Sequence, residues 1–390
     1  MKITCETRIK TQIMDVATGL CVKERPWEKN LILDTGLNAL AGGANSTYGA
    51  GCFTDIYVGS GTTPTSTASG AITFTQATNQ LTASGGFFTV GMVGMLFKYG
   101  TGTAGAEYYI TAFTSSTLVT VDTSITVATP TVGTVWAVNQ TALVTKLHSG
   151  TSYQTLTGDN STVLTAGGVI THQRKIIIAP QGTTYTVNEI GYNNDAINTG
   201  FTNPLVGRIV LSSSDVITTS QYYLVTIQLV ITYSPATPTA VANVGTNINT
   251  AGTVMIEDLI GTKGGVDTIQ TNGYPAGAGV FEFGGSPRLC FASSVFTQNG
   301  APGNGLAIFA LNSFGAATWT NVGGSRGTMT VTYSASVTTS GQTLYGLGLA
   351  VNNSSGVVAD VLFTTPQTAP TGTFQPNTVW QMVFNRALSN

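Results

Sequence analysis

Short strand-like runs separated by turn-forming residues recur along almost the whole chain. Runs of alternating or β-branched residues, such as 54–59 and 221–233, are bounded by Gly, Ser, Asn and Pro. Thr and Val fit a pleated, half-buried strand better than a helix. Repeated short strands with such turns are typical of sandwiches and barrels. The sequence therefore predicts an all-β fold built from tandem β-sandwich (jelly-roll-like) domains.

Charged residues are scarce and unevenly distributed. They make up 8% of the 390 residues, against about 25% in an ordinary globular protein. Ten of the 32 charges lie within the first 29 residues. A free monomer normally needs surface charge to stay dispersed, whereas a neutral surface can be buried against other proteins without desolvating ions. The distribution predicts a component of an assembly rather than a diffusing enzyme.

Net charge and hydropathy argue against two classes of partner. The formal net charge is −2, without the clustered basic patch of a nucleic-acid-binding surface. The longest apolar runs, 175–178 and 222–231, are far shorter than the roughly 20 residues of a membrane-spanning helix. The first residues alternate like a strand instead of forming the apolar segment of a secretion signal. We therefore expect no nucleic acid, no membrane insertion and assembly in a cytoplasm.

The N-terminal residues predict a β-hairpin. Residues 2–14 alternate with a period of two, 15–19 have the composition of a turn, and 20–25 return. Because nearly a third of the charges lie here, we expect residues 1–30 to form a hairpin arm that is either solvated or docks onto another part of the assembly.

One segment, residues 30–41, has a helical pattern. Asp34 or Thr35 can cap it, Leu37 and Leu40 give it a short apolar face, and two glycines at 42–43 end it. Few other segments of the chain have a helical pattern.

The pattern changes between residues 73 and 138, where aromatic and aliphatic residues are dense. We interpret this block as a small β-barrel-like domain inserted into a host, since surface loops tolerate such insertions. Host strands are expected at 174–179, 185–192, 205–211 and 221–233, and residues 234–239 have the composition of a linker. The predicted units are the arm 1–30, a first sandwich from 31–72 plus 139–235, the insertion 73–138, and a second sandwich at 241–390.

The last 150 residues are similar in order and spacing to the host strands. Residues 185–194 parallel 343–353, residues 205–213 parallel 357–365, and 221–230 parallel 378–388. An internal duplication and a chance similarity between strands rich in Thr and Val both explain this pattern.

Two glycine motifs match patterns of known sites. Residues 100–105 match G-x-G-x-x-G, but a strand pattern follows where a dinucleotide site needs a helix. Residues 323–327 match G-x-S-x-G, but a strand at 328–333 follows, and both histidines come earlier in the chain. We interpret both motifs as hairpin turns.

With two histidines and four dispersed cysteines, most metal and nucleophile constellations are absent. His148 and His172 are interpreted as loop or edge residues. Cys5, Cys21, Cys52 and Cys290 contain no C-x-x-C pair and are interpreted as buried free thiols, with a Cys5–Cys21 bridge across the hairpin as the alternative. We predict no metal and no cofactor.

Paired carboxylates are the remaining catalytic option, because glycan cleavage uses two of them. The candidates are Asp55, Glu107, Asp159, Glu189, Asp195, Asp215, Glu257, Asp258 and Asp267. Glu189 lies inside an apolar strand pattern, and we interpret it as one half of a buried or interfacial salt bridge with Arg208. Glu257 and Asp258 are interpreted as a turn, so no catalytic residue is assigned.

The four tryptophans are spread singly along the chain, which indicates core anchors rather than a stacking platform for nucleic acid. They are Trp27, Trp136, Trp319 and Trp380.

Several of these segments occur in a familiar order. A W-x-x-N-L stretch at 27–40 precedes a V-G-S-G-T-T-P turn at 58–64, and Glu189-Ile190-Gly191 and Arg208-Ile209-Val210 strands follow. This order resembles bacteriophage tail-fibre and tail-associated structural proteins, over roughly 1–72 and 139–235. The 73–138 block is similar to barrel-like modules of phage fibres. The resemblance implies a role in the virion.

The expected function is that of a virion structural protein, most simply a tail component: a fibre, tail adaptor or baseplate-associated protein. Its expected partners are itself, in a cyclic homo-oligomer, and other virion proteins. A capsid decoration, cement or head-fibre protein is the first alternative. A glycan-binding or glycan-cleaving tailspike-like protein, with host surface glycan as partner, is the second.

Overall fold

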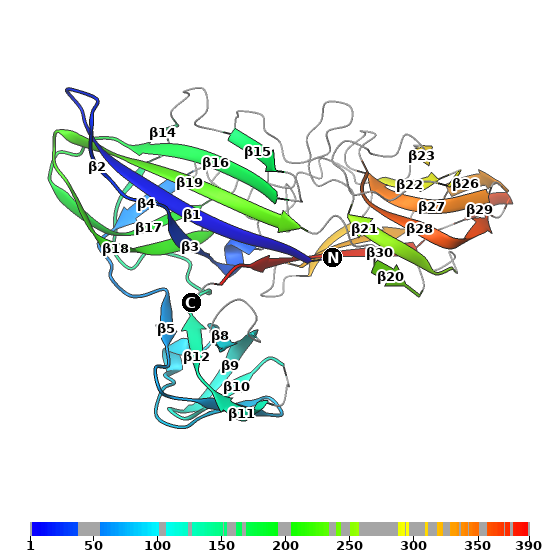
Figure 1. Cartoon of the computed structure of the whole chain (residues 1–390), viewed down its shortest axis with the longest axis horizontal. Helices are drawn as coiled ribbons and strands as arrows, with labels where there is room; N and C mark the ends of the chain where they lie inside the picture. The colour runs from blue at the N-terminus through cyan, green and yellow to red at the C-terminus, as the bar shows by residue number, and fades with distance from the viewer. Residues whose placement is uncertain are drawn as a thin grey trace.

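The computed structural model of the chain is nearly all β, as predicted (Figure 1). The structure describes residues 2–37, 55–100, 107–123, 127–150, 152–153, 161–165, 169–193, 204–233, 239–242, 250–256, 288–292, 294–295, 309–310, 318–322, 328–334, 337–341, 343–350, 357–369, 371–374 and 377–388.

The largest sheet has 14 strands, with a main path β13-β4-β17-β18-β3-β1-β19-β16-β14. Its strands are β1 (Lys2–Asp15), β2 (Cys21–Glu24), β3 (Glu28–Ile32), β4 (Asp55–Gly59), β13 (Lys146–Gly150), β14 (Ser152–Tyr153), β15 (Ser161–Thr165), β16 (Val169–Ile178), β17 (Tyr185–Asn193), β18 (Gly207–Ile217), β19 (Gln221–Tyr233), β24 (Thr318–Val322), β25 (Thr328–Ser334) and β30 (Asn377–Arg386). The two ends of the path approach each other, because a Cβ on Gly150 would lie 2.3 Å from the backbone oxygen of Ile177. The sheet is therefore folded nearly closed around its core.

Strand β1 lies inside this sheet, where the sequence predicted a separate arm. It pairs with β19 over almost its whole length, and along its other edge with β30, β3 and β2 in turn. The alternation explains this position: Cys5, Thr7, Ile9, Thr11 and Ile13 are buried, and the charged residues between them lie on the opposite face. The predicted hairpin is confirmed, since β1 and β2 pair antiparallel around a turn at residues 16–18.

The helix predicted at 30–41 is wrong in its first residues. Asn30 pairs with Thr7 of β1, and Leu31 pairs with Arg208 of β18, so this segment is strand β3. Ladder pairing on both edges outweighs a weak local helix preference. Asp34–Leu37 do form a helical turn, and the rest of the predicted helix lies outside the described residues.

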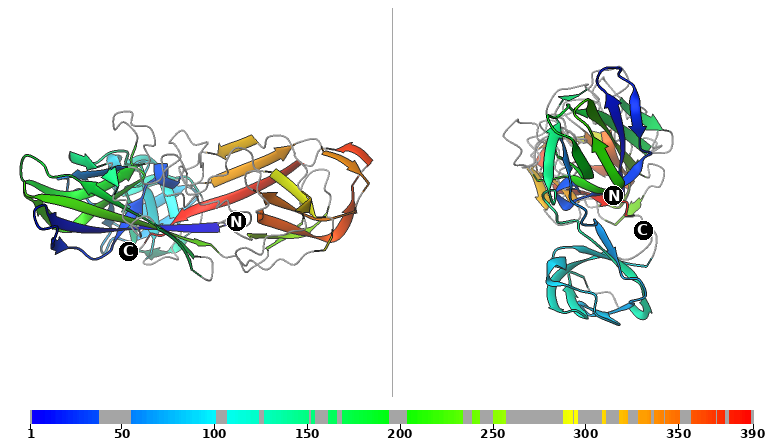
Figure 2. Two further views of the ribbon diagram at one scale, coloured as in Figure 1. Left: turned by 90° about the horizontal axis from the view of Figure 1, so that it is seen from above. Right: turned by 90° about the vertical axis from the view of Figure 1, so that its left-hand side faces the viewer.

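The inserted block forms its own eight-stranded sheet, in the order β11-β6-β7-β10-β9-β8-β12-β5. Its elements are β5 (Ser66–Ala68), β6 (Phe74–Ala77), β7 (Gln80–Ala83), the 3-10 helix η2 (Val90–Met92), β8 (Leu96–Tyr99), β9 (Glu107–Ser115), β10 (Leu118–Val121), β11 (Val127–Thr131) and β12 (Gly133–Trp136). Because β5 pairs with β12, this sheet begins at residue 66, earlier than the predicted 73. The insertion projects to one side of the long axis of the molecule (Figure 2).

The C-terminal part contains a six-stranded sheet, β20-β21-β28-β27-β22-β23, and a two-stranded sheet, β26-β29. These strands are β20 (Thr239–Val241), β21 (Gly252–Ile256), β22 (Arg288–Ala292), β23 (Phe309–Ala310), β26 (Val337–Ser340), β27 (Thr343–Ala350), β28 (Val357–Thr368) and β29 (Thr371–Phe374). Strands β24, β25 and β30 join the large sheet instead. Residues 241–390 therefore contribute strands to three sheets, and the large one is shared with N-terminal strands.

The strands behind the suspected duplication correspond in part. Strands β17 and β18 form an antiparallel pair, as do β27 and β28. Their third members differ: β19 lies between β1 and β16, whereas β30 lies between β25 and β1. The duplication remains a prediction.

Candidate functional site

A fully buried ion pair joins β17 and β18. Glu189 and Arg208 lie on these neighbouring strands, their side chains are 0% exposed, and carboxylate and guanidinium are 2.8 Å apart. The salt bridge predicted from the sequence is confirmed.

Backbone groups complete this pair. The carboxylate of Glu189 accepts hydrogen bonds from the N–H groups of Gly61 (3.1 Å), Val144 (3.2 Å) and Thr145 (2.8 Å). Arg208 donates to the side-chain oxygen of Gln140 and to the backbone oxygen of Thr63, each at 2.9 Å. We call this group of residues the Glu189 clamp.

The glycines of the V-G-S-G-T-T-P turn are explained by the clamp. A Cβ on Gly61 would lie 2.4 Å from a carboxylate oxygen of Glu189, and one on Gly59 would lie 2.7 Å from it. Only glycine lets the backbone approach the carboxylate this closely. The clamp ties together the two connections that lead into the insertion, 60–65 and 137–145.

A second polar group lies where β18 bulges. The β17–β18 register runs from Val187 opposite Asp215 to Glu189 opposite Val210, so residues 211–214 of β18 face the single residue Asn188, three more than an even register. Ser212, Ser213 and Ser214 are exposed on this bulge, and Asp215 turns back into the core.

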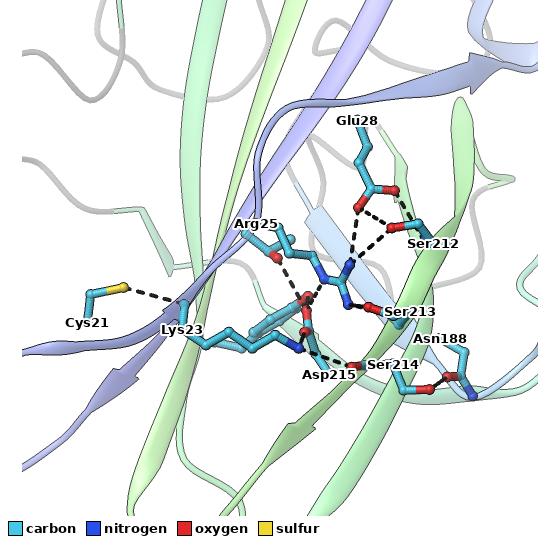
Figure 3. Close-up of polar contacts among 11 residues, drawn as sticks. Cys21, Lys23, Arg25, Glu28, Asn188, Ser212, Ser213, Ser214 and Asp215 are labelled. Carbon is cyan, nitrogen blue, oxygen red and sulfur yellow. Dashed lines mark hydrogen bonds and ion pairs between the residues drawn. The ribbon is translucent and has the colours of Figure 1, made fainter.

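Asp215 is the centre of this group (Figure 3). Its carboxylate receives Arg25 Nε at 2.9 Å, Lys23 Nζ at 2.6 Å, the Tyr223 hydroxyl at 2.7 Å and the Thr11 hydroxyl at 3.3 Å. Burial alone would raise the pKa of Asp215, but these donors outweigh it and hold the pKa below its ordinary value. The carboxylate therefore stays charged at neutral pH.

A shell of hydrogen bonds surrounds Arg25. The guanidinium donates to Glu28 at 3.2 Å, to the Ser212 hydroxyl at 3.3 Å, and to Ser213 through both its backbone and hydroxyl oxygens. Glu28 accepts from the N–H and hydroxyl of Ser212 at 3.2 and 3.1 Å. We call Lys23, Arg25, Glu28 and residues 212–215 the Asp215 cluster. It fastens β2 and the start of β3 to β18.

Beside this cluster, the end of the hairpin and the neighbouring end of β18 expose aliphatic side chains. Val16, Leu20 and Val22 of the hairpin and Val216 of β18 are each more than half exposed. The N–H of Val16 donates to Ser220 at 2.9 Å, which holds the hairpin turn against the β18–β19 turn. We call these four residues the hairpin tip. It is an exposed apolar surface fixed to the fold by a buried ionic anchor.

Among the described residues, the two histidines, Asp55 and Glu107 lie apart from the Glu189 clamp and the Asp215 cluster. His148 on β13 packs edge-on against Tyr185 with ring centroids 4.4 Å apart, and burial lowers the pKa of His148. His172 lies on β16 opposite Leu229. Asp55 and Glu107 lie on different sheets. The remaining candidates, Asp159, Asp195, Glu257, Asp258 and Asp267, lie outside the described residues.

The carboxylates of Glu189 and Asp215 are both engaged by cations. In the part of the chain that the structure describes, no group of three or more His, Cys, Asp or Glu could hold a metal ion. Glu189 is held by Arg208, and Asp215 has a lowered pKa, whereas a glycosidase acid needs a raised one. Both carboxylates act as cross-links between strands.

The glycine motifs lie between paired strands. Residues 100–105 connect β8 to β9, and 323–327 connect β24 to β25, and each pair is antiparallel. The strand that follows each motif is confirmed, so neither has the helix that a nucleotide site or a nucleophile elbow requires.

The thiol and tryptophan predictions hold in part. Neither Cys5 nor Cys21 forms a disulfide; Cys5 is buried, but Cys21 is exposed and lies opposite Met14, so the two do not face each other. Trp136 is buried, whereas Trp27 is 39% exposed and is no core anchor. The environments of Cys52 and of the Cys290, Trp319 and Trp380 side chains lie outside the described part.

Sequence reasoning missed the partners of Asp215. The signal was present, because three serines followed by an acidic residue interrupt an apolar strand pattern at 212–215, as a bulge does. Arg25 lies 190 residues before Asp215 in the chain, and only the fold brings the two together.

No protein-family model, no curated protein and no solved structure matches this chain. Within the described residues, no helix is long and apolar enough to cross a membrane.

Proposed function

We propose that this chain is a bacteriophage virion structural protein, most simply a tail component, which assembles with copies of itself through neutral, β-rich surfaces. The observation that carries the proposal is the hairpin tip. Four aliphatic side chains stand exposed at one end of the large sheet, beside an edge strand, β2, whose described partner is β1 alone. Edge strands and exposed apolar patches are sites of protein association.

The anchoring of the tip supports this role. A docking surface binds more tightly when it is already rigid, because less conformational entropy is lost on binding. The Asp215 cluster holds β2 in place through the ion pairs that Lys23 and Arg25 form with Asp215. The low charge of the remaining chain agrees with extensive contact between neighbours.

The resemblance supports the proposal in a second way. The turn at 58–64, Glu189 and Arg208 come from distant parts of the motif order, and they meet in the Glu189 clamp. These residues therefore act together as one structural unit at the root of the insertion, as a motif shared by scaffold proteins would.

The oligomeric state of the purified full chain tests the proposal. We expect mass photometry and negative-stain images to show a closed ring or an elongated trimer. A compact, stable monomer at micromolar concentration would contradict self-assembly and would turn attention to capsid binding or to glycans.

A pair of variants tests the role of the tip. Replacing Leu20 and Val22 with Lys places two charges on the proposed interface, and we expect it to shift the oligomer towards the monomer. Val90→Lys is the matched control, because Val90 is equally exposed but lies on the insertion. Equal effects of the two changes would remove the tip from the interface.

A further inference from the structure

The end of β30 reaches the junction between the host and the insertion. Residues Val383–Arg386 pair with Lys2–Cys5 of β1, and this is the one parallel strand pair among the described residues. Beyond it, the N–H of Ala387 donates to the backbone oxygen of Cys5 at 2.8 Å. In Figure 1, β30 runs from the C-terminal part towards the insertion. We call residues 383–388 the strap.

Arg386 connects the strap to both the host and the insertion. Its guanidinium donates to the backbone oxygen of Ile32 at 2.7 Å and to the carboxylate of Asp34, both on the host. It also donates to the hydroxyl of Tyr109, on β9 of the insertion, at 3.1 Å. The same hydroxyl donates to Asp34 at 2.8 Å. One arginine therefore holds three parts of the chain together.

Lys98 makes a second connection from the insertion. It lies on β8, is 1% exposed, and donates from Nζ to the backbone oxygen of Leu388 at 2.9 Å. Burial lowers the pKa of this ammonium. Leu388 itself is buried in a cluster shared by the host and the insertion, which also contains Leu31, Leu33, Tyr57, Leu96, Tyr109, Trp136, Val138 and Leu205.

The insertion has a core of its own. Its buried cluster is formed from residues 74–135 alone and includes Phe74 and Phe97, whose ring centroids are 4.7 Å apart. Two chain segments connect it to the host. The folding of the insertion and its orientation are therefore held by separate sets of contacts.

We propose that the strap is a conformational latch, which fixes the insertion against the host while it is docked and frees the insertion when it withdraws. Withdrawal leaves Lys98 and Asp34 in the junction without their strap partners. A buried charge that loses its partner is strongly destabilising. Opening the junction to water relieves this penalty, so strap release and insertion movement are coupled.

Hydrogen–deuterium exchange on Arg386→Ala in the full chain tests the latch. The N–H of Asp34 donates to Val138, in the connection that leaves the insertion, and the N–H of Ala387 fastens the strap. We expect exchange at both positions to rise about tenfold or more. The N–H groups of Phe88 and Val121 bond within the insertion, and we expect their exchange to stay within about threefold.

Two results would overturn the proposal. Unchanged exchange at Asp34 would show that the strap does not hold the junction. An equal rise at Phe88 and Val121 would show that the insertion and the host unfold as one unit. Arg8→Ala is the matched control, because Arg8 is a partly exposed arginine on β1 paired with Glu6, and it should leave all four positions unchanged. Arg386→Lys keeps the charge without the planar fork of donors and should give a smaller rise at Asp34, which keeps the test usable if the alanine variant does not fold.

Discussion

The Glu189 clamp and the Asp215 cluster are built from the same groups but differ in how their charges could reach water. In the clamp, both charged side chains are 0% exposed and their other partners are mainly backbone groups of loops. In the cluster, the carboxylate is 1% exposed, but Lys23 reaches it from an edge strand with 43% of its side chain exposed. A cation released from the cluster can rehydrate, whereas one released in the clamp stays buried. The clamp is therefore closed to water throughout, whereas the cluster combines a buried pair, Arg25 and Asp215, with one cation, Lys23, on its exposed side.

Breaking the Glu189 clamp should give the largest loss of stability. Glu189→Gln keeps the shape of the side chain but leaves the Arg208 charge buried without a counter-charge. We expect the free energy of unfolding to fall by about 3–5 kcal/mol, measured by urea denaturation. The control is Glu24→Gln, at an exposed ion pair with Lys10, where we expect a much smaller loss. A loss for Glu189→Gln as small as that of the control would refute the contrast.

Removing the charge at the centre of the cluster should cost less. Asp215→Asn leaves Arg25 with Glu28 as its remaining carboxylate and lets Lys23 turn to solvent. We expect a loss of about 2–3 kcal/mol. Proteolysis within 16–25 should become faster while the β17–β18 pair stays protected. Equal loosening of both regions would mean that the cluster and the clamp are one cooperative unit.

Acid should weaken the cluster through Asp215. Because its folded pKa lies below the ordinary value of 3.8, its contribution is fully present above that value and is lost as the pH falls through the folded pKa. We expect the stability difference between the wild type and Asp215→Asn to be constant near neutral pH and to shrink below about pH 4. Urea denaturation at a series of pH values measures this, and a difference that keeps its neutral value throughout the acid range would contradict the assignment.

Whether a region can be predicted from the sequence depends on how far apart in the chain its contacting residues lie. The Glu189–Arg208 pair could be predicted, because the two residues lie on successive strands and an acid inside an apolar strand requires a nearby cation. The all-β fold class and the hairpin could be predicted from the period-two alternation of the sequence. The position of β1 inside the sheet could not be predicted, because its partners β19 and β30 begin more than 200 residues later. For the same reason, Asn30–Ile32 had a helical pattern locally and form a strand between β1 and β18.

The smallest loss of stability is expected for a change on the exposed side of the Asp215 cluster. Lys23→Ala removes a cation that is 43% exposed, and Arg25 continues to pair with Asp215. Exposed ion pairs contribute roughly 0–1 kcal/mol and weaken as salt increases. We therefore expect a loss below about 1 kcal/mol that largely disappears in 1 M salt, measured by urea denaturation at two ionic strengths. The loss for Glu189→Gln should change little with salt, because water and ions do not reach the clamp. A salt-independent loss for Lys23→Ala of similar size to that of Glu189→Gln would mean that Lys23 is effectively buried, and that the hairpin tip is fixed as firmly as the root of the insertion.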